Sequence, residues 1–230
     1  MKKILARGGI EFLAVLLGIT GSLYIDRLNN ENEIKDETRD SFISLIAELD
    51  ENINNLELWH SHIEISLNQF EILLGTNNYS SLTNKELDRM FFYTLSSFGE
   101  KMRSSIFNSM ESSGLIYKID DKKIRNLILE LYQITYTRHD WLLDFDQVRF
   151  QQMFELVANE FIFDDKPTIN KGFWNLDWAN KRNIEQLKTN YKYRNFLISN
   201  RSNKNMYLSQ NRVAKKMTEE VLLKLNNYLK

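Results

Sequence analysis

Residues 7–27 read RGGIEFLAVLLGITGSLYIDR, an apolar stretch that carries one internal acid, Glu11. From Gly8 to Ile25 there are 18 residues, of which Glu11 is the only charged one, and extension back to Ile4 gives 22. An α-helix rises about 1.5 Å per residue, so this length covers a hydrocarbon layer of about 30 Å. We therefore expect residues 1–25 to form one transmembrane helix that anchors the chain in a lipid bilayer.

Two other interpretations of this stretch stay open. A secretory signal would have the basic residues of 2–7 before its apolar part and the small residues at 20–22 as a cleavage site. A buried core helix would have no reason for charge clusters at both ends. The span is favoured because the apolar run is long for a signal and helical periodicity continues past Asp26. Three Lys or Arg residues flank each end, so charge does not decide the orientation.

The small residues of this helix share a stripe with the acid. Steps of four and three residues connect Arg7, Glu11, Ala14, Gly18 and Gly21, and Ser22 follows Gly18 by four. Small residues let helix backbones approach closely in a bilayer, and an intramembrane carboxylate is costly unless it faces a bundle interior, water or a partner charge. We expect a homo-oligomer, such as a tetramer, whose copies of Glu11 line a pore. Alternatively, Glu11 lies near the membrane boundary and pairs with Arg7 or reaches the headgroups.

The rest of the chain predicts an all-α protein, in which residues 26–230 form a soluble bundle of long helices. One Pro and eight Gly in 230 residues leave few helix breakers. Apolar residues hold helical spacing up to Gly75, Thr83 and Glu86 have capping-box form, and Asp120 or Asp121 is placed to cap a helix that runs toward Phe161. We expect a last helical stretch over 184–228, with a break near 199–205.

Two segments carry a family resemblance. They are GGIEFLAVLLGITGSLYIDRLNNENE after Arg7 and FNSMESSGLIYKIDDKKIRNLILELYQ at 107–133. They resemble a bacterial family of single-span helical proteins of unassigned function, with Leu28 standing where that family usually has Trp. The matching positions are Gly9, Glu11, Gly18, Asn29, Asn30, Ser112, Ser113, Gly114 and Arg125. In layout the chain is also similar to the channel effector of the Hailong anti-phage system, which implies a nucleotidyltransferase partner whose oligonucleotide product controls the channel.

The residues that catalysis or a metal site would require are not apparent in the sequence. Cysteine is absent, and no phosphate-binding glycine loop, GxSxG or HExxH motif occurs. His60 and His62 point to different sides of a helix, and His139 has no second ligand at four-residue spacing. Asp140 and Asp144 share a helix face, which is more typical of a solvated stripe than of a catalytic pair. We expect neither an enzyme, a metal site nor a cofactor.

The charges are divided unequally along the chain. Residues 1–165 hold 16 Lys and Arg against 27 Asp and Glu, or −11, whereas residues 166–230 hold 14 against 4, or +10. Cations among aromatic rings suit a single-stranded nucleic acid, because they pair with phosphates and stack on bases. We expect a nucleotide or oligonucleotide to bind Lys188, Tyr191, Lys192, Tyr193, Arg194, Arg201 and Lys204. Pairing with the acidic residues of 1–165 and contact with anionic lipid are the open alternatives.

Together these patterns favour a homo-oligomeric membrane effector whose pore a bound nucleotide or oligonucleotide controls, and the resemblance in layout implies an ion channel in anti-phage defence. Its location would be the bacterial inner membrane, with residues 26–230 in the cytoplasm, where such a ligand is made. The alternative is a membrane-tethered helical scaffold or sensor that binds a protein partner and forms no pore.

Overall fold

The computed structural model describes the backbone of residues 2–75, 82–160 and 189–230. Side chains are described in these ranges except at 2–14, 84–85, 87–88, 91, 157–158 and 160. Within the described backbone every regular element is helical and no strand occurs, which confirms the all-α prediction. The elements are α1 (Lys2–Leu74), α2 (Asn84–Leu95), α3 (Ser105–Ser112), η2 (Leu115–Lys118), α4 (Lys122–Glu130), η3 (Leu131–Tyr136), α5 (Thr137–Glu160) and α7 (Tyr191–Tyr228).

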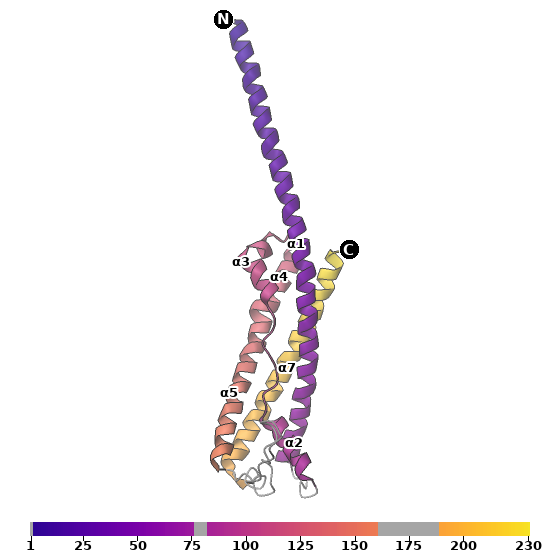
Figure 1. Cartoon of the computed structure of the whole chain (residues 1–230), viewed down its shortest axis with the longest axis vertical. Coiled ribbons are helices and arrows are strands. Elements are labelled where there is room, and N and C mark those ends of the chain that lie inside the picture. Colours follow the sequence, from indigo (N-terminus) through magenta and orange to yellow (C-terminus); the bar gives the residue numbers. More distant parts are fainter. Residues whose placement is uncertain (1, 76–81, 161–188) are drawn as a thin grey trace, which may run out of the picture.

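Three long helices, α1, α5 and α7, run side by side along the bundle (Figure 1). The short helices α3 and α4 lie at the end where α1 leaves the bundle, and α2 lies at the opposite end. The amino-terminal part of α1 continues beyond the bundle without a partner helix in the described chain. The fold therefore has a packed body and one projecting helix.

The packing of α1 follows from a regular sequence repeat. Its buried positions recur after four and then three residues, which is the spacing of a helix that packs along a second helix. This repeat faces mainly α7. The buried residues of α1 are Thr38, Phe42, Leu45, Glu48, Leu49, Asn52, Leu56, Trp59, Ile63, Ser66, Phe70 and Leu73.

The same repeat runs through α7 without interruption, so the predicted break near 199–205 is wrong. Three polar residues of this run, Asn200, Asn203 and Lys204, are buried, and two of them have partners on other segments. Asn200 Nδ2 donates to the Thr94 carbonyl at 3.3 Å, and Lys204 Nζ donates to the Ser96 carbonyl at 2.9 Å. The regularly spaced buried positions are Tyr193, Leu197, Asn200, Lys204, Tyr207, Asn211, Ala214, Thr218, Val221 and Leu225.

The predicted helix starts are confirmed. Thr83 and Glu86 form a capping box, and hydrogen bonds from Thr83 hold the pKa of the Glu86 carboxyl below its usual value. Asp121 caps α4 by accepting from the Lys123 and Ile124 amides at 2.8 and 3.2 Å. Helix α2 ends at Leu95, because Ser96 is extended.

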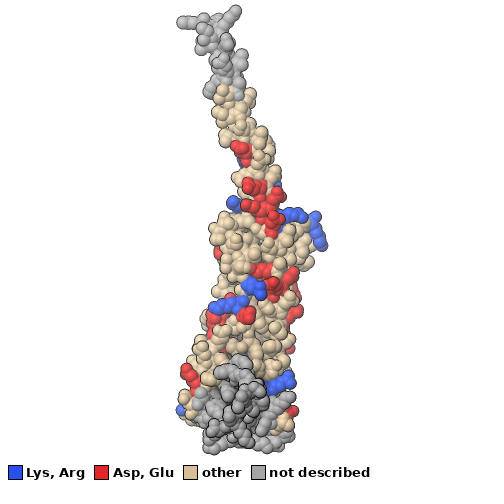
Figure 2. Space-filling view, viewed as in Figure 1, with Lys and Arg blue, Asp and Glu red and all other residues tan. Residues whose placement is uncertain are grey.

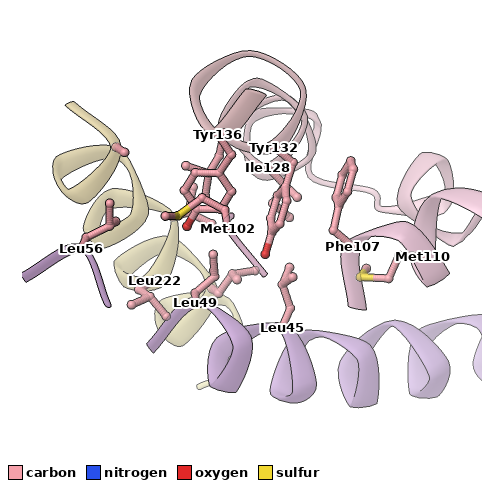
Figure 3. Packing of buried hydrophobic residues seen from close by; sticks show 14 of the residues in the cluster. Leu45, Leu49, Leu56, Met102, Phe107, Met110, Ile128, Tyr132, Tyr136 and Leu222 are labelled. Carbon is pink, nitrogen blue, oxygen red and sulfur yellow. The ribbon is translucent and has the colours of Figure 1, made fainter. Parts of the chain in front are cut away.

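Two apolar cores fill the described bundle. The proximal core lies toward the end where α1 leaves, and Figure 3 shows Leu45 and Leu49 of α1 facing Tyr132 and Ile128 across it. The distal core lies toward α2 and contains Phe70, Leu73, Met90, Leu95, Met153, Tyr193 and Leu197.

One buried acid organises the proximal core. Glu48 accepts from the Ser105 hydroxyl at 2.9 Å, from the Ile106 amide at 2.8 Å and from the Tyr132 hydroxyl at 2.7 Å. Burial and the neighbouring Glu48 charge raise the pKa of Tyr132 above its usual range. Tyr132 lies in η3, a π-helical turn between α4 and α5. Glu48 thus ties α1 to the start of α3 and to this turn.

Candidate functional site

The projecting part of α1 exposes apolar side chains, as the sequence led us to expect. All described side chains of residues 15–33 are exposed, and Ile34 is the first to pack against a core. Seven large side chains here are between 47% and 71% exposed: Val15, Leu16, Leu17, Ile19, Leu23, Tyr24 and Ile25. In the described chain this apolar surface has no protein partner.

The predicted self-association stripe is open where it is described. A Cβ added at Gly18 or Gly21 would meet no other atom within 4 Å, and Ser22 is exposed. A second helix therefore has room to approach this face closely. The side chains of Glu11 and Ala14 lie outside the described residues, so the predicted pore acid stays a prediction.

Among the described residues, no helix has an apolar stretch long enough to cross a membrane. The predicted span, residues 1–25, includes residues 1–14, whose side chains lie outside the described residues.

Acidic side chains gather where α1 leaves the bundle (Figure 2). Exposed acids follow the apolar part of the helix, and Arg27 Nε pairs with Glu31 Oε1 at 2.8 Å. These charges separate the apolar surface from the bundle. The exposed acids of this segment are Asp26, Glu31, Glu33, Asp36 and Glu37.

Three of the predicted ligand residues lie in one exposed turn of helix. Tyr191 is 69% exposed, and Lys192 and Arg194 are also exposed, all in the first turn of α7. Asn190 caps this turn by accepting from the Lys192 amide at 3.0 Å. Lys188 lies outside the described residues.

The other predicted ligand residues are placed elsewhere. Tyr193 is fully buried in the distal core. Arg201 Nη1 pairs with Glu71 Oε1 of α1 at 2.9 Å. Lys204 is 1% exposed and has its own internal partner, so neither Lys204 nor Tyr193 presents a side chain to a ligand at the surface.

Cations of α7 instead form a ladder with acids of α1. Besides Arg201 with Glu71, Arg212 pairs with Glu64 at 3.1 Å and Lys215 with Glu57 at 2.7 Å. The acids are seven residues apart, and the pairs run in opposite chain directions, as two antiparallel helices require. These contacts are the internal charge matching that the sequence left open as an alternative to ligand binding.

Lys204 forms a different kind of pair. Its Nζ lies 2.6 Å from Asp146 Oδ2 of α5, and both side chains are 1% exposed. Burial lowers the pKa of Lys204, which the charge of Asp146 partly offsets. The ammonium also lies 5.7 Å from the centre of the Phe98 ring. A charge pair this deep is costly to form and costly to break on one side.

We call the residues around this pair the polar layer: Ser66, Ser96, Asp146, Asn200, Asn203 and Lys204. Several of its polar atoms have no hydrogen-bond partner among the described residues, namely Ser96 Oγ, Asp146 Oδ1, Asn200 Oδ1 and Asn203 Nδ2. Ser66 donates to the Tyr93 carbonyl at 2.5 Å. The layer lies between the two cores, because Leu197 belongs to the distal core and Tyr207 to the proximal one.

Tyr207 and His139 extend the polar region into the proximal core. The His139 ring is fully buried, lies 5.7 Å from the Trp59 ring and 5.1 Å from the Tyr207 ring, and leaves Nε2 without a partner in the described chain. Gly99 has φ +140°, and a Cβ at this position would collide with the Tyr207 hydroxyl. In the described residues no cluster of His, Asp or Glu is placed to hold a metal ion.

The sequence interpretation missed the polar layer, although a signal was present. Asp146 follows Leu142 and Leu143 and precedes Met153 at helical spacing, so it falls on the buried face of α5. Lys204 falls on the buried repeat of α7 in the same way. A charged residue on each of two apolar repeats indicates a buried pair.

Comparison of the chain with known protein families, with characterised proteins and with solved structures finds no match.

Proposed function

We propose that the protein is a homo-oligomeric membrane effector, in which the amino-terminal helices associate into an ion-conducting bundle and the helical body responds to a ligand. The projecting apolar helix carries this proposal. Burial of apolar surface is favourable by roughly 25 cal/mol per Å², and residues 15–25 pack against no other element of the described chain. A lipid bilayer and further copies of the same helix would cover it.

The stripe supports association of these helices. Gly18, Gly21 and Ser22 leave room for close backbone approach, which drives helix association in lipid through packing. Copies of Glu11 on the same stripe would then face the axis of the bundle, where a carboxylate meets water instead of lipid. Such a ring would favour cations over anions.

The ligand proposed is a nucleotide or a short oligonucleotide bound at the start of α7. The exposed Tyr191, Lys192 and Arg194 support it, since they combine a ring for stacking with two cations for phosphates. The resemblance in layout adds a role in anti-phage defence, with a nucleotidyltransferase that supplies the ligand.

Ion flux through liposomes that contain the purified full-length protein tests the pore. We expect flux in the wild type and its loss in Gly18→Leu, because the added side chain separates the helices. The matched control is Ile19→Leu, which introduces the same residue one position away and off the stripe. Flux that is absent under all ligand conditions, or that survives both Gly18→Leu and Glu11→Ala, would remove the pore from the proposal.

Binding of short fluorescein-labelled single-stranded DNA of random sequence tests the ligand. We expect binding to weaken steeply with salt and to fall in Lys192→Glu and Arg194→Glu, because each contact to a phosphate releases counterions. Lys216→Glu is the control, since Lys216 is exposed on the same helix and far from this end. Equal losses in all three variants would show a non-specific effect of charge.

A membrane-tethered scaffold is the second candidate. Exposed apolar residues on η3, α5 and α7 favour it, because the surface of a protein partner would cover them. Replacement of residues 1–25 by an unrelated transmembrane helix separates the two functions. Retained cellular activity would favour the scaffold, and lost activity with retained membrane insertion would favour the pore. The exposed residues are Ile134, Trp141, Val148, Ile198, Met206, Val213 and Leu223.

A further inference from the structure

We propose that the polar layer is a breakpoint of the bundle, at which the distal half opens and closes while the proximal half stays folded. The proposal is independent of the membrane function and depends only on how the body of the protein is packed.

The described residues of the two halves differ in the apolar surface that they bury. Among the described residues the proximal core contains 25 buried apolar residues, whereas the distal core contains seven. Buried apolar contact is the main cost of local opening, so the smaller core opens more readily. The ion pair between Arg201 and Glu71 holds the distal half, but it is partly exposed and adds little.

Four chain segments place a polar residue at the same level of the bundle. Ser66 comes from α1, Ser96 from the end of α2, Asp146 from α5 and Lys204 from α7. Lys204 Nζ contacts both Asp146 and the Ser96 carbonyl, so α7, α5 and the end of α2 meet at one point, and Ser66 of α1 joins α2 through the Tyr93 carbonyl. A polar level therefore interrupts the apolar packing between the two cores.

When the helices separate at this level, polar groups that folding had removed from water become hydrated again. Lys204 and Asp146 regain water when the helices separate, and so do the unpartnered atoms of Ser96, Asn200 and Asn203. No such gain accompanies separation within an apolar level. The free energy needed to separate the helices therefore changes abruptly at the polar layer.

The opening is a splaying of helix ends, since α1, α5 and α7 pass through the layer without a break. The side chain of Arg149 crosses the boundary region, because its Nη2 donates to Ser199 Oγ at 2.9 Å and its guanidinium lies over the rings of Phe145 and Phe196. Helix α2 and the adjoining ends of α5 and α7 would separate from the end of α1.

Native-state hydrogen exchange of the full-length protein in detergent, read by mass spectrometry, tests the breakpoint. We expect amides of 66–74, 90–95, 150–156 and 193–200 to exchange through one shared opening. Amides of 42–60, 124–143 and 207–225 should exchange more slowly. Replacing the pair in Asp146→Leu with Lys204→Met should slow the distal amides by about tenfold and leave the proximal ones unchanged.

The control removes a buried polar contact inside the proximal core. Tyr136 Oη lies 2.8 Å from Thr218 Oγ1, and Tyr136→Phe with Thr218→Val removes this contact without touching the layer. It should not change distal exchange. If the layer variant does not fold, Asn203→Leu provides a second test with the same expectation, because Asn203 is buried and its Nδ2 has no partner among the described residues. A single exchange rate for both halves in the wild type, or equal slowing of both halves in the layer variant, would overturn the proposal.

Discussion

Lys204 and Lys215 belong to the same helix and each pairs with one acid, yet their surroundings give the two pairs opposite properties. Lys204 and Asp146 are both 1% exposed, whereas Lys215 and Glu57 are 35% and 54% exposed. Burial lowers the pKa of Lys204, and the hydrogen bond to Glu57 raises the pKa of Lys215. The exposure and the pKa of a cation in a basic sequence segment thus depend on the helix face on which it lies.

The largest expected effect comes from breaking the buried pair on one side. Asp146→Ala leaves the Lys204 ammonium buried and unpaired, which should lower the free energy of unfolding by about 3–5 kcal/mol. Glu57→Ala, the matched change at the exposed pair, should have a much smaller effect. Urea unfolding followed by circular dichroism measures both, and equal losses would contradict the difference between the pairs.

Removing both partners of the buried pair should not lower the free energy of unfolding as removing one partner does. Asp146→Leu with Lys204→Met exchanges two desolvated charges for apolar contact, so the free energy of unfolding should stay unchanged or rise by about 1–4 kcal/mol. The same urea titration measures it. A double variant less stable than Asp146→Ala alone would show that the pair itself supplies most of the stability of the layer.

The pH dependence of stability should differ in sign between the two lysines. The folded pKa of Lys204 lies below its usual 10.5, so between these values the unfolded chain holds the extra proton and stability rises with pH. The folded pKa of Lys215 lies above 10.5, so its contribution is complete below that pH and is lost as pH rises past it.

Urea unfolding at increasing alkaline pH, compared between variants, measures these slopes. In the double variant at the buried pair, the rise of stability with pH that Lys204 causes should disappear. In Lys215→Met, the loss of stability with pH that Lys215 causes should disappear. Identical slopes in the wild type and the double variant would contradict the lowered pKa of Lys204.

The smallest expected effect is at the exposed ladder. Arg212→Ala removes the pair with Glu64, whose side chains are 60% and 49% exposed, and should cost about 0.2–1 kcal/mol. The loss should shrink further at high salt, because exposed charges are screened. A loss as large as that of Asp146→Ala would place the ladder among the main determinants of stability.

Local signals in the sequence were sufficient for most of the helices. The repeat from Phe42 to Leu73, the capping box at Thr83 and the cap at Asp121 depend on neighbours within a few residues, and all three are confirmed. The π-helical turn η3 was not predicted, because no local pattern distinguishes it from the α-helix on either side.

The candidate site depended on contacts between distant segments and was predicted less well. A polar run at 199–205 suggests a loop, but Asn200 and Lys204 find partners 106 and 108 residues away, so the helix continues. Composition alone likewise placed Lys204 among surface cations. The acid repeat Glu57, Glu64 and Glu71 was the available sign that α7 cations have internal partners.

Because α1 has no break between Lys2 and Leu74, it transmits torque along its length. No hinge between the projecting segment and the bundle can absorb a rotation of this segment about the helix axis. Such a rotation therefore reaches Phe42 and Leu45 in the proximal core. One residue inserted at Asn29 would turn the two ends relative to each other by about 100°. The direction in which Gly18 and Gly21 face is therefore set by the angular position of the helical body about the α1 axis.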